Sequence, residues 1–126
     1  MKKLIAPARI LFGTIWLIFG LNFYFNFFQL PPPNAAEGAL LGALFNTGYF
    51  FHLVKVLEIL CGALLILNLF VPLSLVVLSS LTVNIFLIHA LLDQAGLPLA
   101  VLLVVLNIFL GFAYIESFKP MLKAKA

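Results

Sequence analysis

The sequence predicts an all-α integral membrane protein: a bundle of four antiparallel helices with a short extra helix in the first outer loop. Three observations support this prediction: an apolar composition, four long apolar runs, and basic residues confined mostly to the two ends. Hydrophobic residues make up 65% and charged residues 9% of the 126 residues, and the mean hydropathy is +1.25. Soluble domains carry about 45–50% apolar and about 25% charged residues. The composition therefore excludes a soluble globule, and the length suits a single domain over 1–126.

Each of the four apolar runs has about the 20 residues needed to cross a bilayer. The sequence predicts membrane spans over 8–29, 49–70, 72–93 and 97–118. Pro31, Pro32 and Pro33 end the first run, because proline cannot continue a helix. Pro72 suits the first turn of the third helix, and Gly96 with Pro98 marks the last break. Two of these connections are short, so consecutive helices are expected to be antiparallel neighbours.

The connection between the first two runs contains a short helical signal of its own. Asn34 followed three residues later by Glu37 forms a capping-box pattern, and Gly48 suits the end of the segment. The residues between them are apolar but too few to span a membrane. We therefore expect an interfacial or re-entrant helix in this loop.

The positions of the basic residues predict the orientation. They gather at the two ends of the chain, and the connections after the first and third runs contain no Lys or Arg. The terminal basic residues are Lys2, Lys3, Arg9, Lys119, Lys123 and Lys125. Under the positive-inside rule both termini face the cytoplasm, which an even number of spans allows. The basic pI is therefore a signal of topology in the lipid bilayer, and no nucleic-acid partner is expected.

Ionisable residues inside a span are costly and usually mark function or a buried pair. In the second run, His52, Lys55 and Glu58 follow at spacings of three and share one sector of the helix. Lys55 and Glu58 are expected to pair, which lowers the cost of burying either side chain. A functional pair and a purely structural pair are both open interpretations.

The other polar residues also fall in the outer halves of their predicted helices. They are Asn22 in the first run, and Asn84, His89 and Asp93 in the third. Their shared depth favours a polar pocket that opens outward, under the short helix of the first loop. Within the pocket we expect Glu58 to exchange protons, Lys55 to pair with it, and His89 to act as a second donor or acceptor near the mouth. Ligand contacts are expected from Asn22, His52, Asn84 and Asp93.

Several polar residues are better explained by helix packing. Ser79 and Thr82 point to one side of the third helix, and Asn107, Gly111 and Tyr114 share one face of the fourth. Such positions favour hydrogen bonds between helices or close packing. Asn84 points nearly opposite to Ser79 and is expected to bond a different helix.

Metal and haem chemistry have weak support. His52 and His89 have matching depths, so haem held by two histidines is a minor alternative, as is a metal held with Glu58 and Asp93. Cys61 is the only cysteine, which excludes an intrachain disulfide and any cysteine-built cluster.

Three stretches resemble the DoxX family of small four-helix bacterial membrane proteins. They are ARILFGTIWLIFGLNFYF, GYFFHLVKVLEILCGALLIL and VPLSLVVLSSLTVNIFLIHALL, with loose patterns around Gly20, Glu58 and Gly62. Many DoxX-like proteins have a Lys shortly after the glycine that matches Gly20, where this chain has Asn22 and Phe23. The resemblance implies a bacterial inner-membrane protein, and some family members are linked to quinone-dependent oxidation or to membrane redox complexes.

Three functions follow as hypotheses. The first is a quinone-linked redox subunit, whose pocket accepts a quinone head group. Because the chain has one cysteine and no dinucleotide motif, it would need a partner redox subunit for electrons. The second is a non-enzymatic carrier or binding protein for a small or lipid-like ligand. The third is an assembly factor or homo-oligomer that packs through Gly38, Gly42 and Gly111.

Overall fold

A computed structural model describes residues 2–26, 34–92, 94–122 and 124. These residues form α1 Lys2–Phe25, α2 Ala35–Phe45, α3 Phe50–Leu67, α4 Val71–Leu87, the π-helix η1 Ile88–Leu92, the 3₁₀ turn η2 Gln94–Gly96, α5 Leu97–Ala113, α6 Ile115–Phe118 and the 3₁₀ turn η3 Lys119–Leu122. Three helices, over Lys3–Phe25, Phe50–Leu67 and Val71–Leu92, are long and apolar enough to cross a membrane. The described part of the chain is thus all-helical where it is regular, as predicted.

The fourth predicted span is interrupted in the structure. The run over 97–118 was expected to be one helix, but α5 ends at Ala113 and the segment Ile115–Leu122 turns away by 78°. At the junction Tyr114 leaves helical geometry, with φ −109° and ψ 25°, while its side chain packs against the hydrophobic core. The described residues therefore contain three candidate spans, or four if the bent pair counts as one.

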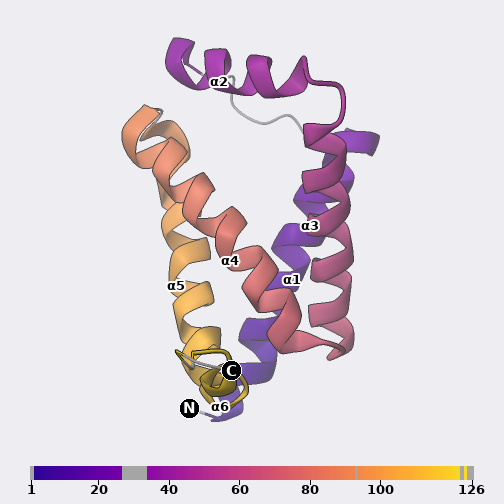
Figure 1. Ribbon diagram of the computed structural model, residues 1–126, viewed down its shortest axis with the longest axis vertical. Coiled ribbons are helices and arrows are strands. Elements are labelled where there is room, and N and C mark those ends of the chain that lie inside the picture. The colour runs from indigo at the N-terminus through magenta and orange to yellow at the C-terminus, as the bar shows by residue number, and fades with distance from the viewer. Residues whose placement is uncertain (1, 27–33, 93, 123, 125–126) are drawn as a thin grey trace.

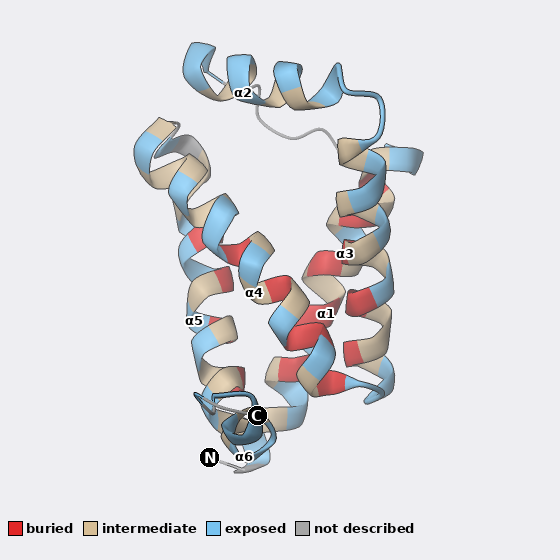
Figure 2. Cartoon of the chain, in the orientation of Figure 1, coloured by how far each residue is buried: buried red, intermediate tan, exposed pale blue. Residues whose placement is uncertain are grey.

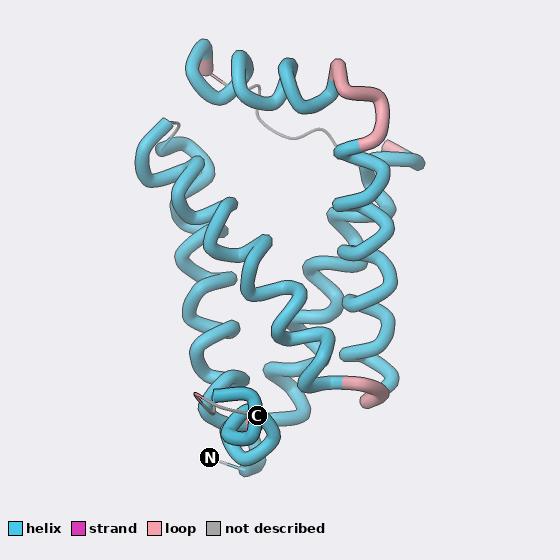
Figure 3. The backbone as a smooth tube through the Cα atoms, in the orientation of Figure 1, coloured by secondary structure: helices cyan, strands magenta, loops and turns pink. Residues whose placement is uncertain are grey.

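The long helices form two pairs that meet near one end of the molecule (Figure 1). α1 packs along α3, α4 packs along α5, and further contacts join α3 to α4 and α1 to α5. Toward the other end the pairs separate, and α2 lies across that end (Figure 3). We call this the α2 end. Both termini lie at the opposite end, beside α6, which we call the termini end.

The buried core lies where the helix pairs meet (Figure 2). Its largest fully buried side chains are Phe12, Trp16, Leu65, Leu75, Leu78 and Leu110. Only 17–28% of each candidate span is buried inside the protein, so most of the apolar surface faces outward. An apolar outer surface of this kind is compatible with contact with lipid.

Glycines bring α1 and α3 into close contact. A Cβ atom on Gly62 would lie 2.7 Å from the carbonyl oxygen of Gly13, and one on Gly13 would lie 2.7 Å from the carbonyl oxygen of Gly62. Small residues of this kind let helix backbones approach each other. The α1–α3 pair is therefore packed backbone against backbone.

Asn107 provides a polar link between α4 and α5. Its Nδ2 donates to Ser79 Oγ at 3.1 Å, and its Oδ1 accepts from the hydroxyl of Thr82 at 3.3 Å. These bonds confirm the expectation that Ser79, Thr82 and Asn107 join neighbouring helices.

The predicted helix signals are also confirmed. The side chain of Asn34 caps α2 by accepting from the backbone N–H of Glu37 at 2.9 Å. Pro72 and Pro98 lie in the first turns of α4 and α5. α1 begins earlier than predicted, and the expected end of the first span at 29 lies outside the described residues.

Candidate functional site

The predicted pair of Lys55 and Glu58 forms on α3. Lys55 Nζ lies 3.3 Å from Glu58 Oε2 and 3.4 Å from Oε1. The side chain of Glu58 is 4% exposed and that of Lys55 is 19% exposed. A spacing of three residues places both side chains on one helix face. Few other charged side chains lie within the candidate spans.

The surroundings of Glu58 come from α1. Gly20 lies directly against it, because a Cβ atom on Gly20 would be 3.3 Å from Glu58 Cβ and 2.7 Å from Ile59 Cγ1. Asn22 is also buried on α1. The carboxylate is therefore shielded from lipid, as a functional or structural buried charge requires.

An aromatic cluster continues the site toward the α2 end. The ring centroid of Phe23 lies 5.9 Å from Lys55 Nζ, within reach of a cation–π interaction. Phe23 also stacks on Phe51, with ring centroids 6.0 Å apart. The hydroxyl of Tyr24 lies 3.0 Å from His52 Nδ1. We call Phe23, Tyr24, His52, Lys55 and Glu58 the α1–α3 cluster.

The sequence predicted three members of this cluster, His52, Lys55 and Glu58, as site residues, but it did not predict that Phe23 and Tyr24 join them. One signal would have found them: Tyr24 and His52 lie at the same end of two antiparallel neighbours, so their depths match. The rotation of α1 about its axis was not available from its sequence.

His89 belongs to a second polar group, at the junction of α2 with η1 and η2. Its Nδ1 lies 3.8 Å from Glu37 Oε2, and Gly96 packs directly against its imidazole ring. In the same region the side-chain amide of Asn34 donates to the carbonyl of Leu92. These contacts attach α2 to the end of α4. The π-helical geometry of η1 is of a kind often found at functional sites.

The remaining predicted ligand-contact residues have separate outcomes. Asn84 is exposed, and its Nδ2 donates to the carbonyl of Ser80 in its own helix at 3.4 Å. The expected bond from Asn84 to a different helix does not form with any described residue. The reason is that Asn84 faces away from the packed side of α4. Asp93 lies outside the described residues.

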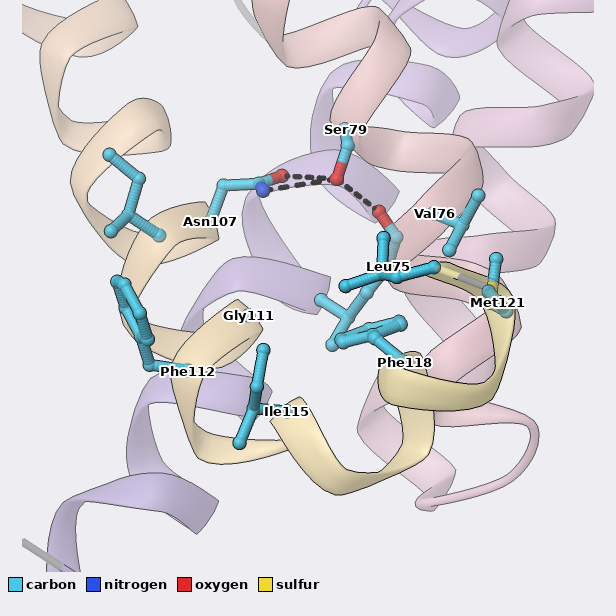
Figure 4. Close-up of a pocket in the computed structure, with 11 residues that line it drawn as sticks. Leu75, Val76, Ser79, Asn107, Gly111, Phe112, Ile115, Phe118 and Met121 are labelled. Atoms are coloured by element: carbon cyan, nitrogen blue, oxygen red, sulfur yellow. Dashed lines mark hydrogen bonds between the residues drawn. The ribbon is translucent and has the colours of Figure 1, made fainter. Parts of the chain in front are cut away.

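A groove of about 380 Å³ opens at the termini end, between α4, α5 and the α6–η3 segment. Figure 4 shows Phe112, Ile115, Phe118 and Met121 around it, with the Ser79–Asn107 hydrogen bond on one side. The predicted polar pocket was expected near the α2 end instead. This apolar groove is therefore a separate feature.

The α1–α3 cluster combines a buried carboxylate, an ammonium group, an imidazole–phenol pair and aromatic side chains. Within the described part of the chain, no three His, Cys, Asp or Glu side chains gather to hold a metal ion. Comparisons with protein-family models, curated proteins and solved structures found no match. The chemistry of these side chains is therefore the basis for assigning a function.

Proposed function

We propose that the protein is a quinone-linked redox subunit of the bacterial inner membrane, and that the α1–α3 cluster binds the quinone head group. The observation that carries this proposal is the pairing of buried Glu58 with partly buried Lys55, next to the exposed Tyr24–His52 contact. The resemblance to the DoxX family supports the same assignment. In this proposal the long helices form an antiparallel four-helix bundle, with α5 and the bent α6–η3 segment as the fourth member and both termini in the cytoplasm.

The burial of the pair favours function. A second Lys–Glu pair at the same spacing, Glu116 and Lys119, has an N–O distance of 2.8 Å, but its side chains are 81% and 60% exposed. An exposed pair costs little to maintain. Burying two charges costs several kcal/mol per ion before their mutual attraction offsets it. A sequence that keeps Lys55 and Glu58 within an apolar helix therefore retains a costly feature.

A quinone head group matches the donors of the cluster. Its two carbonyl oxygens accept hydrogen bonds, which the Lys55 ammonium and the imidazole or phenol of the His52–Tyr24 pair can donate. Its flat ring suits contact with an aromatic group such as the exposed Tyr24. Asn22 adds a neutral amide on α1, and His89 would serve the approach from the α2 end.

The chemistry requires both protons and electrons. Reduction of a quinone to a quinol takes two electrons and two protons. Glu58 would pass protons to the reduced oxygens, and Lys55 would stabilise its carboxylate after each transfer. With one cysteine and no dinucleotide motif in the sequence, the electrons must come from a partner redox subunit.

The proposal is tested on the purified full chain. We expect quinone in the lipid extract, and an increase in melting temperature when a short-chain ubiquinone or menaquinone analogue is added. Glu58→Gln should abolish that increase, while Glu116→Gln, the matched exposed carboxylate, should leave it intact. An extract and titration that are both negative would exclude the redox assignment. A redox-inert lipid held by the cluster would favour the carrier hypothesis instead.

A further inference from the structure

We propose that the groove between α4, α5 and the α6–η3 segment binds one acyl chain of an anionic phospholipid, with the phosphate beside Lys119. This inference rests on embedding in a membrane and is independent of quinone binding. The groove volume of about 380 Å³ lies within the range of roughly 300–1,000 Å³ typical of small-molecule sites.

The shape of the groove follows from the bend after α5. Because Ile115–Leu122 turns by 78°, it closes the termini end of the furrow between α4 and α5. Figure 4 shows Phe118 and Met121 on this segment facing Leu75 and Val76 of α4. The lining is apolar except at Ser79 and Asn107, which bond each other. A flexible hydrocarbon chain suits these walls, whereas a polar ligand would lack partners.

Gly111 lies in the wall of the groove, with open space beside it. It lines the groove, and a Cβ atom at this position would meet nothing within 4 Å. The glycine is therefore not required for helix contact, in contrast to Gly62. A larger side chain here would occupy the groove without displacing the backbone of a neighbour.

The charges at the mouth select an anionic lipid. Lys119 adjoins the lining residue Phe118, and its side chain is exposed, as is that of its partner Glu116. An exposed salt bridge contributes little to stability. The Lys119 ammonium can therefore leave Glu116 and bind a phosphate at a small cost in free energy. α1, which begins at Lys2, starts at the same end of the molecule and carries Lys3 in its first turn. Basic residues near a membrane surface attract anionic lipids. The net charge of the chain, +3, favours the same attraction.

Native mass spectrometry of the delipidated full chain tests the proposal, with phosphatidylglycerol and phosphatidylcholine as probes. We expect one tightly bound phosphatidylglycerol per chain and weaker binding of phosphatidylcholine. Gly111→Leu should weaken phosphatidylglycerol binding at least ten-fold. Lys119→Gln should weaken it about five-fold and weaken phosphatidylcholine binding less, because the choline cation offsets the charge of its phosphate.

Two further variants make the test specific. Gly42→Leu is the matched control on α2, because a Cβ atom there also meets nothing within 4 Å, and it should bind phosphatidylglycerol normally. Val76→Phe fills the groove from α4, so it replaces Gly111→Leu if that variant fails to fold. Equal binding by filled and unfilled grooves would overturn the proposal. A wild-type dimer that Gly111→Leu converts to a monomer would also overturn it, by assigning the groove to a second copy.

Discussion

Arg9 Nη1 donates a hydrogen bond to the carbonyl oxygen of Leu65 at 2.8 Å and so ties α1 to the last turn of α3. The last carbonyls of a helix lack partners within it. Here Asn68 adopts left-handed geometry with φ 59°, and Leu69 N–H bonds the carbonyl of Leu64 at 2.9 Å, which is a Schellman ending. The buried guanidinium of Arg9 adds a charge-assisted bond and is attracted to the negative end of the helix dipole.

Replacing Arg9 should therefore weaken the α1–α3 pair. We expect Arg9→Met to lower the free energy of unfolding by about 1–3 kcal/mol, because it removes a charged hydrogen bond to a buried carbonyl. Thermal unfolding in detergent measures this, with Lys3→Met as the control for loss of a terminal charge. Equal stability of the two variants would show that the bond contributes nothing.

The contact of Gly13 with Gly62 gives a second prediction. Gly62→Ala would place a Cβ atom 2.7 Å from Gly13 O and 2.8 Å from Leu17 N, which are both backbone atoms. We expect a loss of about 1–3 kcal/mol from forced separation of the helices. Gly42→Ala is the matched control: nothing lies within 4 Å there, so the better helix propensity of alanine should stabilise α2 slightly. Similar effects of the two changes would contradict the close packing.

These contacts show what the sequence could and could not predict. The apolar runs, the cap at Asn34 and the Lys55–Glu58 pair were predictable because each depends on residues a few positions apart. The break at Tyr114 was not predictable, because neither proline nor glycine occurs at that position. It is the packing of Tyr114 against the core that accompanies the change in backbone direction.

The candidate site was only partly predictable for a related reason. Spacing along one helix can be counted from the sequence, and it placed His52, Lys55 and Glu58 on the same side of α3 correctly. Rotation and tilt depend on contacts between distant segments. The separation of the helix pairs and the position of α2 place His89 beside Glu37, and a local pattern cannot predict that pairing.

Asn107 gives a third prediction, on the α4–α5 contact. We expect Asn107→Ala to destabilise the protein and to make Ser79→Ala nearly neutral in its presence, since the two side chains share a 3.1 Å hydrogen bond. Hydrogen bonds between membrane helices average about 0.6 kcal/mol in double-mutant cycles. A double-mutant cycle of the wild type, the two single variants and the double variant measures the coupling free energy between Ser79 and Asn107. Strictly additive effects would show that their hydrogen bond contributes nothing to stability.

Orientation gives a fourth prediction. Cys61 is buried, so native thiol background should be low in labelling of intact cells. Asn46 and Ser117 are exposed at the α2 end and the termini end, respectively. A membrane-impermeant maleimide should label Asn46→Cys from outside and Ser117→Cys only after the membrane is broken. The reverse pattern would invert the topology that the terminal basic residues indicate.

The fifth prediction separates the two Lys–Glu pairs by burial. Lys55→Met should leave the Glu58 carboxylate buried without its partner and cost about 3–5 kcal/mol. Lys119→Met breaks an exposed pair and should cost about 1 kcal/mol or less.

The double variant Lys55→Met, Glu58→Leu removes both charges, so it should recover most of the stability and still lack the quinone-induced increase in melting temperature. Melting curves with and without the quinone analogue measure both properties at once. If the apolar double variant still responds to quinone, Lys55 and Glu58 are not required for quinone binding. If Lys55→Met lowers the stability no more than Lys119→Met does, the burial of Glu58 does not strengthen its interaction with Lys55.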